Sequence, residues 1–311
     1  MKAPRLNTSF SISCFDNELS TRTSAAEWQR ILQMRNTPLF HAALPAYNTL
    51  ISNYFAEHAI LTRLVTEAWR FEMLVYALHL YDQREPEDSR SGLTTINLQK
   101  ICAQQKCASA GRVLAMVRVL RVAGYLHRHH SDLDSRVVQL VPSAKFIGLV
   151  EGWNRRIFEI IDRVFPRLGL ANHHEKQSRF GWEMRRRGAE HLLDGWKLLD
   201  PFPEVEHFVT SDGGWMLLLH CVAETLKFDT QELAPVTVDL VKFGHKFGVS
   251  RSHLRRLLES AHAKGLLYAP PHNGAHVQLA PHLVASFLNC MASELDNYRR
   301  WGMAAARDLE N

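Results

Sequence analysis

The stretch from Phe247 to Leu267 constrains this chain most, because its pattern predicts a helix with a defined beginning and end. Ser250 follows a Phe-Gly-Val turn and is expected to cap the helix, since a serine hydroxyl can accept from the first backbone N–H groups. Apolar side chains then recur at the spacing of one helical face: Leu254, Leu257, Leu258 and Ala261. Gly265 is typical of the left-handed residue that follows a helix. With a short helix expected over Asp239–Lys246, the pattern predicts a helix-turn-helix followed by an extended run.

The opposite face of the same helix carries hydroxyl and guanidinium groups. Ser252, Arg255 and Arg256 lie on it, and Arg251 is near the helix start. A cation at a helix N-terminus opposes the helix dipole, which costs about 0.3–1 kcal/mol. An external anion facing that end would offset this cost, so the pattern indicates a helix that contacts DNA.

The same pattern occurs earlier in the chain. Ser109 is the expected cap and Gly124 the expected end of a helix whose apolar face is Val113, Met116, Val117 and Leu120. When Gly124 is aligned with Gly265, Ser109 matches Ser250. A polar hairpin over His129–Ser135 is expected to join two strands as a wing. Two copies in one chain are rarer by chance than a single match, so the sequence indicates an internal duplication.

Residues 107–142 and 247–281, including Asp132-Leu133-Asp134-Ser135-Arg136 at the first wing, resemble winged helix-turn-helix regulators of the MarR type (multiple-antibiotic-resistance regulators). The resemblance implies that the recognition helix and wing contact double-stranded DNA. It also implies a dimer interface built from terminal helices and a small apolar or aromatic effector. The chain departs from the family by fusing two copies, so we expect either a monomeric pseudo-dimer or a homodimer through the helical frame.

The expected fold is mostly α with small β-hairpin wings, and two tandem winged-helix domains are joined and flanked by a helical frame. Amphipathic helices of that frame are expected over Ile147–Val164 and Ser178–Leu199. A flexible N-terminal arm is expected over residues 1–24. Residues 25–165 are expected to form part of the helical frame and the first winged-helix domain, with its helix-turn-helix and wing at 94–142. Residues 166–311 are expected to form linking helices, the second winged-helix domain with its helix-turn-helix and wing at 236–281, and a C-terminal helix.

Positive charge is concentrated in the two copies. The whole chain has a net charge of +5, yet residues 94–142 hold seven Lys and Arg against two Asp, and residues 236–281 hold six against one Asp and one Glu. Such a distribution is typical of a protein that contacts a polyanion at two places. The expected DNA-contacting residues are Ser109, Arg112, Arg118, Arg128, His130, Arg136, Ser250, Arg251, Ser252, Arg255 and Arg256.

The two copies are not expected to contact DNA equally. The first recognition helix presents Gly111, Leu114 and Ala115 where the second presents Ser252, Arg255 and Arg256, so the first offers few hydrogen bonds to bases. An arginine at a wing can enter a narrow minor groove, and the first wing has such residues. We therefore expect the second copy to read bases and the first wing to anchor the protein.

Other functions have little support in the sequence. It contains no Gly-x-Ser-x-Gly, phosphate-binding glycine loop or His-Glu-x-x-His, so neither an enzyme nor a cofactor is expected. The His129-His130 and His173-His174 pairs lack partners at zinc spacing, and no metal is expected. Five scattered cysteines indicate reduced thiols in a cytoplasmic protein, and no apolar run is long enough to span a membrane. Two alternatives remain, namely a tandem winged-helix replication initiator of the plasmid type and a winged-helix scaffold that binds proteins without DNA.

Overall fold

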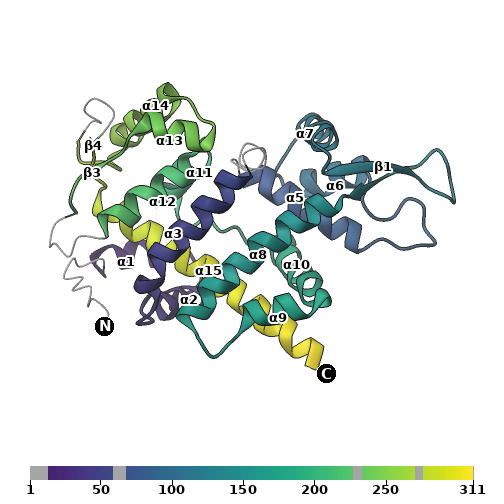
Figure 1. Ribbon diagram of the computed structural model, residues 1–311, viewed down its shortest axis with the longest axis horizontal. Coiled ribbons are helices and arrows are strands. Elements are labelled where there is room, and N and C mark those ends of the chain that lie inside the picture. Colours follow the sequence, from purple (N-terminus) through teal and green to yellow (C-terminus); the bar gives the residue numbers. More distant parts are fainter. Residues whose placement is uncertain (1–12, 59–67, 227–232, 270–275, 311) are drawn as a thin grey trace. The chain divides into compact units, whose positions relative to one another are not determined.

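The protein is described by a computed structural model, which covers residues 13–58, 68–226, 233–269 and 276–310. Over these residues the chain is mostly helical, with two small antiparallel sheets of two strands each (Figure 1). One sheet pairs β1 (Leu126–His130) with β2 (Val138–Pro142), and the other pairs β3 (Val236–Thr237) with β4 (His276–Val277). The expected mostly α fold with small β elements is confirmed at this level.

The chain divides into two compact units that interleave along the sequence, whereas the sequence patterns suggest contiguous ranges. Residues 236–281 lie in unit 1 and residues 94–142 lie in unit 2, so each unit holds one of the two expected copies. Unit 1 combines Met1–Glu67, Ile160–Arg167 and Leu198–Asn297, and unit 2 combines Ala68–Glu159, Leu168–Lys197 and Tyr298–Asn311.

Unit 1 is built around helix α12, which is apolar on nearly every side. Its helices, besides the part of α15 that ends at Asn297, are α1 (Ser13–Ser20), α2 (Ala25–Arg35), α3 (Phe40–Glu57), α11 (Pro203–Val209), α12 (Gly214–Thr225), α13 (Leu240–Phe247) and α14 (Arg251–Ala263), and the whole of α15 is Pro281–Glu310. α12 packs against α3, α11 and β3. A helix that is hydrophobic all round must be buried, and Leu217 and Leu218 are accordingly inaccessible to solvent.

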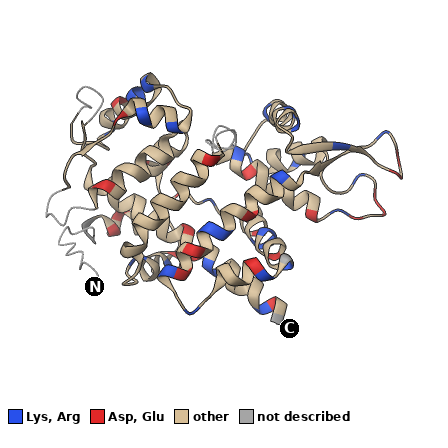
Figure 2. Ribbon diagram, viewed as in Figure 1, with Lys and Arg blue, Asp and Glu red and all other residues tan. Residues whose placement is uncertain are grey.

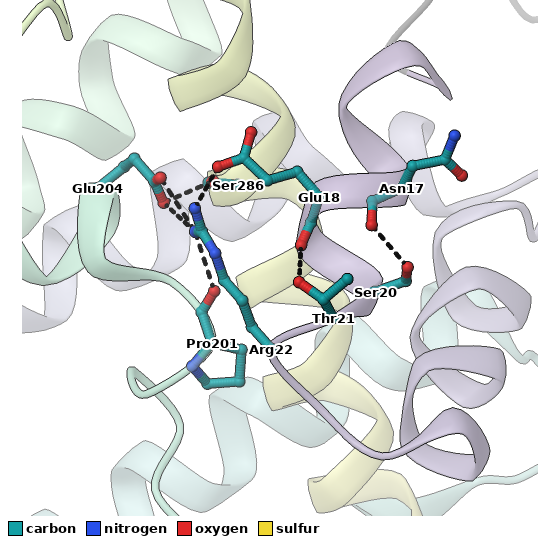
Figure 3. Close-up of polar contacts among 8 residues, drawn as sticks. All are labelled: Asn17, Glu18, Ser20, Thr21, Arg22, Pro201, Glu204 and Ser286. Carbon is teal, nitrogen blue, oxygen red and sulfur yellow. Dashed lines mark hydrogen bonds and ion pairs between the residues drawn. The ribbon is translucent and has the colours of Figure 1, made fainter.

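The described part of the expected N-terminal arm is held by ion pairs and by one buried leucine. Leu19 of α1 is 3% exposed. Figure 3 shows the guanidinium of Arg22 donating to the carboxylate of Glu204 in α11, at 3.0 Å from each oxygen, while the Ser286 hydroxyl of α15 donates to the same carboxylate at 2.9 Å. Of the expected arm, the described residues therefore form α1 and make an ion pair with α11 through Arg22. These contacts join distant stretches of chain, so local periodicity does not reveal them.

A row of polar side chains lies buried along α15 within unit 1. Its members are Ser286, Asn289, Ser293, Glu294, Asp296 and Asn297. The Tyr47 hydroxyl of α3 donates to Glu294 at 2.8 Å, and Arg35 of α2 donates to Asn289 at 2.9 Å. Burial raises the pKa of Glu294 to about 7, and the tyrosine hydrogen bond offsets only part of that effect.

Unit 2 places α5 between the helices of the 94–142 segment and the rest of the unit. Its helices, besides the end of α15, are α5 (Ala68–Asp82), α6 (Thr95–Gln104), α7 (Ala110–Val122), α8 (Ala144–Val164), α9 (Leu170–Lys176) and α10 (Ser178–Leu193), and α8 passes into unit 1 at Ile160. α5 packs against α6, β2 and α10. The expected helix over 178–199 ends six residues early because Gly195 adopts a left-handed conformation with φ +93°.

Candidate nucleic-acid interface

The 236–281 segment contains the expected pair of helices and its expected caps. α13 begins after Asp239, whose carboxylate accepts from the N–H groups of residues 241 and 242 at 3.0 Å each. Gly248 makes the turn with φ +69°. The Ser250 hydroxyl then accepts from the His253 N–H at 3.2 Å and starts α14. Gly265 follows the helix with φ +73°, as the sequence predicts.

One face of α14 is buried and the other is exposed. The four apolar residues predicted from spacing are between 0% and 6% exposed: Leu254, Leu257, Leu258 and Ala261. Arg251, Ser252, Arg255 and Arg256 are all exposed, and Figure 2 shows the resulting concentration of basic residues on this helix. These four DNA-contacting candidates and Ser250 at the cap therefore come from one helix and its N-terminus.

The exposed arginines of α14 differ in their contacts. Nε of Arg255 donates to the Glu259 carboxylate at 2.8 Å, and both side chains are largely exposed. Surface ion pairs of this kind contribute little, so Arg255 can exchange the carboxylate for a phosphate or a base at small cost. No ion pair of Arg251 or Arg256 is found within the described ranges. Their guanidinium groups are the least engaged cations on this surface.

The 94–142 segment repeats these local features in unit 2. The Thr94 hydroxyl accepts from the Asn97 N–H at 3.0 Å and caps α6. Lys106 has a left-handed conformation with φ +54° in the turn. The Ser109 hydroxyl accepts from the Arg112 N–H at 3.4 Å and caps α7.

The ends of α7 and α14 have the same hydrogen bonds. Tyr125 N–H donates to the Leu120 carbonyl at 2.8 Å, and Leu266 N–H donates to the Ala261 carbonyl at 2.9 Å. Each bond spans a left-handed glycine, and the two bonds coincide when Gly124 is aligned with Gly265. The sequence alignment of the two segments therefore also aligns their backbone hydrogen bonds.

The outward face of α7 has less hydrogen-bonding capacity than that of α14. Arg112 and Arg118 are exposed, and the guanidinium of Arg112 lies 5.8 Å from the ring centroid of Trp69 in α5. Val119 and Val122 are also exposed, by 47% and 92%. No spacing in the sequence relates Trp69 to Arg112, because they meet only through the packing of unit 2.

The strands β1 and β2 form the expected hairpin, with Leu126 opposite Pro142 and His130 opposite Val138. Arg128 is exposed on β1. At the tip, Nδ1–H of His130 donates to the Ser135 carbonyl at 2.9 Å. These contacts place both candidates on a regular hairpin.

Arg136 lies at the same hairpin tip and pairs with Asp134. Its Nε donates to the carboxylate at 3.0 Å, and hydrogen bonds from the Arg136 side chain and backbone lower the pKa of Asp134. The guanidinium is largely exposed, so this pair orients an accessible cation rather than burying it.

The second wing is only partly described. Leu267 bridges Leu279, and Tyr268 N–H donates to the Gln278 carbonyl at 3.0 Å. The expected wing apex over residues 270–275 lies outside the described residues. Tyr268, in the extended stretch after α14, is 58% exposed.

No metal-binding cluster and no membrane-spanning helix occur within the described ranges. No group of three His, Cys, Asp or Glu side chains there is arranged to hold a metal ion. His174 instead contacts Glu151 at 2.6 Å, and His129 lies 3.9 Å from Asp132. None of the helices described is both long and apolar enough to cross a membrane.

Known proteins supply no further assignment. No protein-family model matches the chain, and no curated protein or solved structure is similar enough to count as a match. We therefore infer the function from the geometry of the 94–142 and 236–281 segments.

Proposed function

We propose that this chain is a sequence-specific double-stranded DNA-binding transcriptional regulator with two winged helices. In this proposal α14 enters a major groove and reads bases, and the β1–β2 wing places Arg136 in a minor groove. The exposed basic face of α14, on a helix whose opposite face is buried, is the observation that carries the proposal.

The order of elements supports the winged-helix part of the proposal. In unit 2 the order is α5, a bridge from Thr94 to Gln139, α6, α7, β1 and β2. In unit 1 it is α12, β3, α13, α14, a bridge from Leu267 to Leu279 and β4. The same order of elements therefore occurs twice: a helix, a short strand contact, a helix-turn-helix and a returning strand.

Electrostatics and helix geometry support the DNA-reading part. The N-terminus of α14 has a positive helix-dipole end and the exposed cations Arg251 and Arg255 within its first turns. This combination attracts phosphate oxygens, while longer side chains farther along the helix can reach base edges. A small-molecule effector and the choice between a monomeric pseudo-dimer and a homodimer remain predictions from the family resemblance.

The direct test is selection of bound genomic fragments by the full chain, followed by footprinting. We expect a single asymmetric site, weaker binding at higher salt, and loss of base preference in Arg256→Ala. Arg136→Ala should weaken binding most at sites with a narrow minor groove. Arg179→Ala is a matched control, because it removes an exposed cation of α10 that pairs with Glu183 at 3.9 Å.

Several results would contradict the proposal. Retention of no fragment at low salt, where phosphate contacts are strongest, would remove DNA binding altogether. Equal losses in Arg256→Ala and Arg179→Ala would mean that α14 does not contact the DNA specifically. Repeated bound sequences near a replication origin, instead of one site near a promoter, would favour the replication initiator.

One observation favours a second function for the 94–142 segment. Val119 and Val122 of α7 are exposed, and Ile96 of α6 is 63% exposed. Exposed apolar side chains on neighbouring helices are typical of a protein contact. This candidate predicts that Val122→Ser weakens binding of a protein partner and leaves DNA binding unchanged.

A further inference from the structure

Two cysteines flank the turn between α6 and α7. The N–H of Cys107 donates to the Cys102 carbonyl at 3.0 Å, around the left-handed residue Lys106. This hydrogen bond is the one that closes a helix C-terminus in the Schellman motif, and it places the side chains at its two ends next to each other. The turn therefore holds the two thiols side by side.

The two thiols are in contact and their environments differ. Cys102 is fully buried, whereas Cys107 is half-buried. The hydrogen bond from Cys102 lowers the pKa of Cys107, and the ammonium of Lys197 lowers it further. Burial and the carboxylate of Glu72 raise it, but their effect is smaller. The same hydrogen bond and burial raise the pKa of Cys102. Cys107 is thus the nucleophile of the pair and Cys102 its proton donor.

The turn itself does not require cysteines. In the matching turn of unit 1, Val249 N–H donates to the Gly244 carbonyl at 2.9 Å around Gly248. Gly244 and Val249 occupy the places of Cys102 and Cys107 there, and the geometry is kept without a thiol. The cysteine pair is therefore an addition to one segment and not a condition for its fold.

We propose that Cys102 and Cys107 form a peroxide-reactive dithiol that closes to a disulfide across the α6–α7 turn. The Cys107 thiolate attacks one oxygen of hydrogen peroxide, the O–O bond breaks, and hydroxide leaves as Cys107 becomes a sulfenic acid. The Cys102 sulfur then attacks the Cys107 sulfur, the S–O bond breaks, and the Cys102 proton leaves with the hydroxide as water. Two electrons pass from the dithiol to the peroxide, which ends as one molecule of water and one hydroxide ion that the solvent protonates.

The surroundings suit this chemistry at Cys107 and not at Cys221 or Cys290. Cys221 and Cys290 are fully buried, and burial raises the pKa of each thiol. Beside the pair, the Tyr76 hydroxyl of α5 is buried and has no hydrogen-bond partner among the described residues. Burial raises the pKa of Tyr76, and the carboxylate of Glu72 and the charges of both thiolates add to the rise, so the hydroxyl lies near enough to donate to a thiolate or to a sulfenic acid oxygen.

Trypsin makes the test unambiguous, because Lys106 separates the two cysteines in sequence. The folded full chain is treated with hydrogen peroxide, its free thiols are alkylated, and the digest is analysed by mass spectrometry. We expect peptides 101–106 and 107–112 to appear joined, with the loss of two hydrogen atoms, and to separate on reduction. Recovery of both peptides fully alkylated would overturn the proposal.

Two serine variants assign the roles. In Cys102→Ser, dimedone should trap a sulfenic acid at Cys107, roughly tenfold or more faster than at Cys221 or Cys290. In Cys107→Ser, Cys102 should remain alkylatable. Trapping at Cys102 at an equal rate, or no trapping at Cys107 in a variant that keeps the wild-type melting temperature, would contradict the assignment. These readouts do not involve DNA, so the thiol site stands or falls separately from the proposed function.

Discussion

The 94–142 and 236–281 segments share their internal geometry and differ in what they present to a partner. Both have a serine cap, a buried apolar face and a left-handed glycine after the second helix. α14 exposes Arg251, Arg255 and Arg256, whereas α7 exposes valines and a few cations. Burial and backbone hydrogen bonds constrain the inner positions, so the outward positions are free to diverge. Comparison of the two segments therefore distinguishes the residues that stabilise the fold of a segment from the residues that determine what it can bind.

The largest expected effect concerns the shared inner face. Leu254→Ala should lower the free energy of unfolding by about 2–5 kcal/mol, because it removes a fully buried side chain. The aligned change Val113→Ala, also fully buried, should cost about 2 kcal/mol because fewer atoms are lost. Denaturant unfolding with hydrogen exchange in α14 and α7 would measure both. A loss well below 1 kcal/mol at Leu254 would contradict the equivalence of the two apolar faces.

A second expected difference concerns one carboxyl of low exposure in each unit, Glu294 in unit 1 and Asp82 in unit 2. Glu294 in unit 1 has Tyr47 as its partner, whereas Asp82 in unit 2 has the Arg185 guanidinium at 3.3 Å. The folded pKa of Glu294 is about 7 against an ordinary value of 4.5, so its contribution to stability is present below about pH 4.5 and is lost as pH rises through 7. Glu294→Gln should therefore stabilise the protein above pH 7 by up to about 3 kcal/mol.

Thermal melts of wild type and Glu294→Gln between pH 4 and 8 would check this prediction. Asp82→Asn is the comparison: burial raises the pKa of Asp82 and the Arg185 guanidinium opposes that rise, so Asp82→Asn should stabilise the protein at neutral pH by less than Glu294→Gln does. A stability difference between wild type and Glu294→Gln that does not change with pH would show that Glu294 does not titrate in this range.

The third effect concerns the outward faces and depends on the proposed function. Arg256→Ala should weaken binding to the selected site by about 1–3 kcal/mol, the range for one arginine contact to a base. Ala115 is the aligned residue of α7 and is exposed, so Ala115→Arg supplies the missing cation to the other segment. If α7 also lies in a groove, Ala115→Arg should strengthen binding and steepen its salt dependence. Titration at three salt concentrations measures both variants, and an unchanged Ala115→Arg would place α7 away from the DNA.

The smallest effect concerns the caps. Ser250→Ala and Ser109→Ala should each cost about 1 kcal/mol, because each leaves a first-turn N–H without its acceptor. The Ser109 hydrogen bond is longer, 3.4 Å against 3.2 Å, so its loss should be the smaller of the two. Ser→Thr variants at the same positions should be nearly neutral. A larger loss at Ser109 would show that α7 depends more on its cap than α14 does.

The predictable parts of the fold depended on local signals. Ser109, Ser250, Gly124 and Gly265 could be assigned because caps and left-handed glycines act within a few residues, and the apolar faces because helical spacing is regular. Gly195 carried the same signal at the end of α10 and was overlooked, although its effect is equally local.

The other parts depended on contacts between distant stretches. In the run Arg185-Arg186-Arg187, Arg185 is held by Glu151 and Asp82 and is mostly buried. Three further features likewise depend on packing within an assembled unit. They are the formation of helix α1, the short helix α9 and the contact of Arg112 with Trp69. No window of sequence contains both partners of these contacts.

The interleaving of the two units has a consequence for synthesis on the ribosome. Helix α3 packs against α12 in unit 1, yet all of residues 68–159 are synthesised between them and belong to unit 2. The apolar side of α3 therefore lacks α12, against which it packs, until most of unit 2 has already emerged. Unit 2 in turn receives its last stretch only with Tyr298–Asn311. Neither unit can complete its folding before its last stretch has emerged, which ends at Asn297 in unit 1 and includes Tyr298–Asn311 in unit 2, so the apolar side of α3 needs protection until α12 has been synthesised.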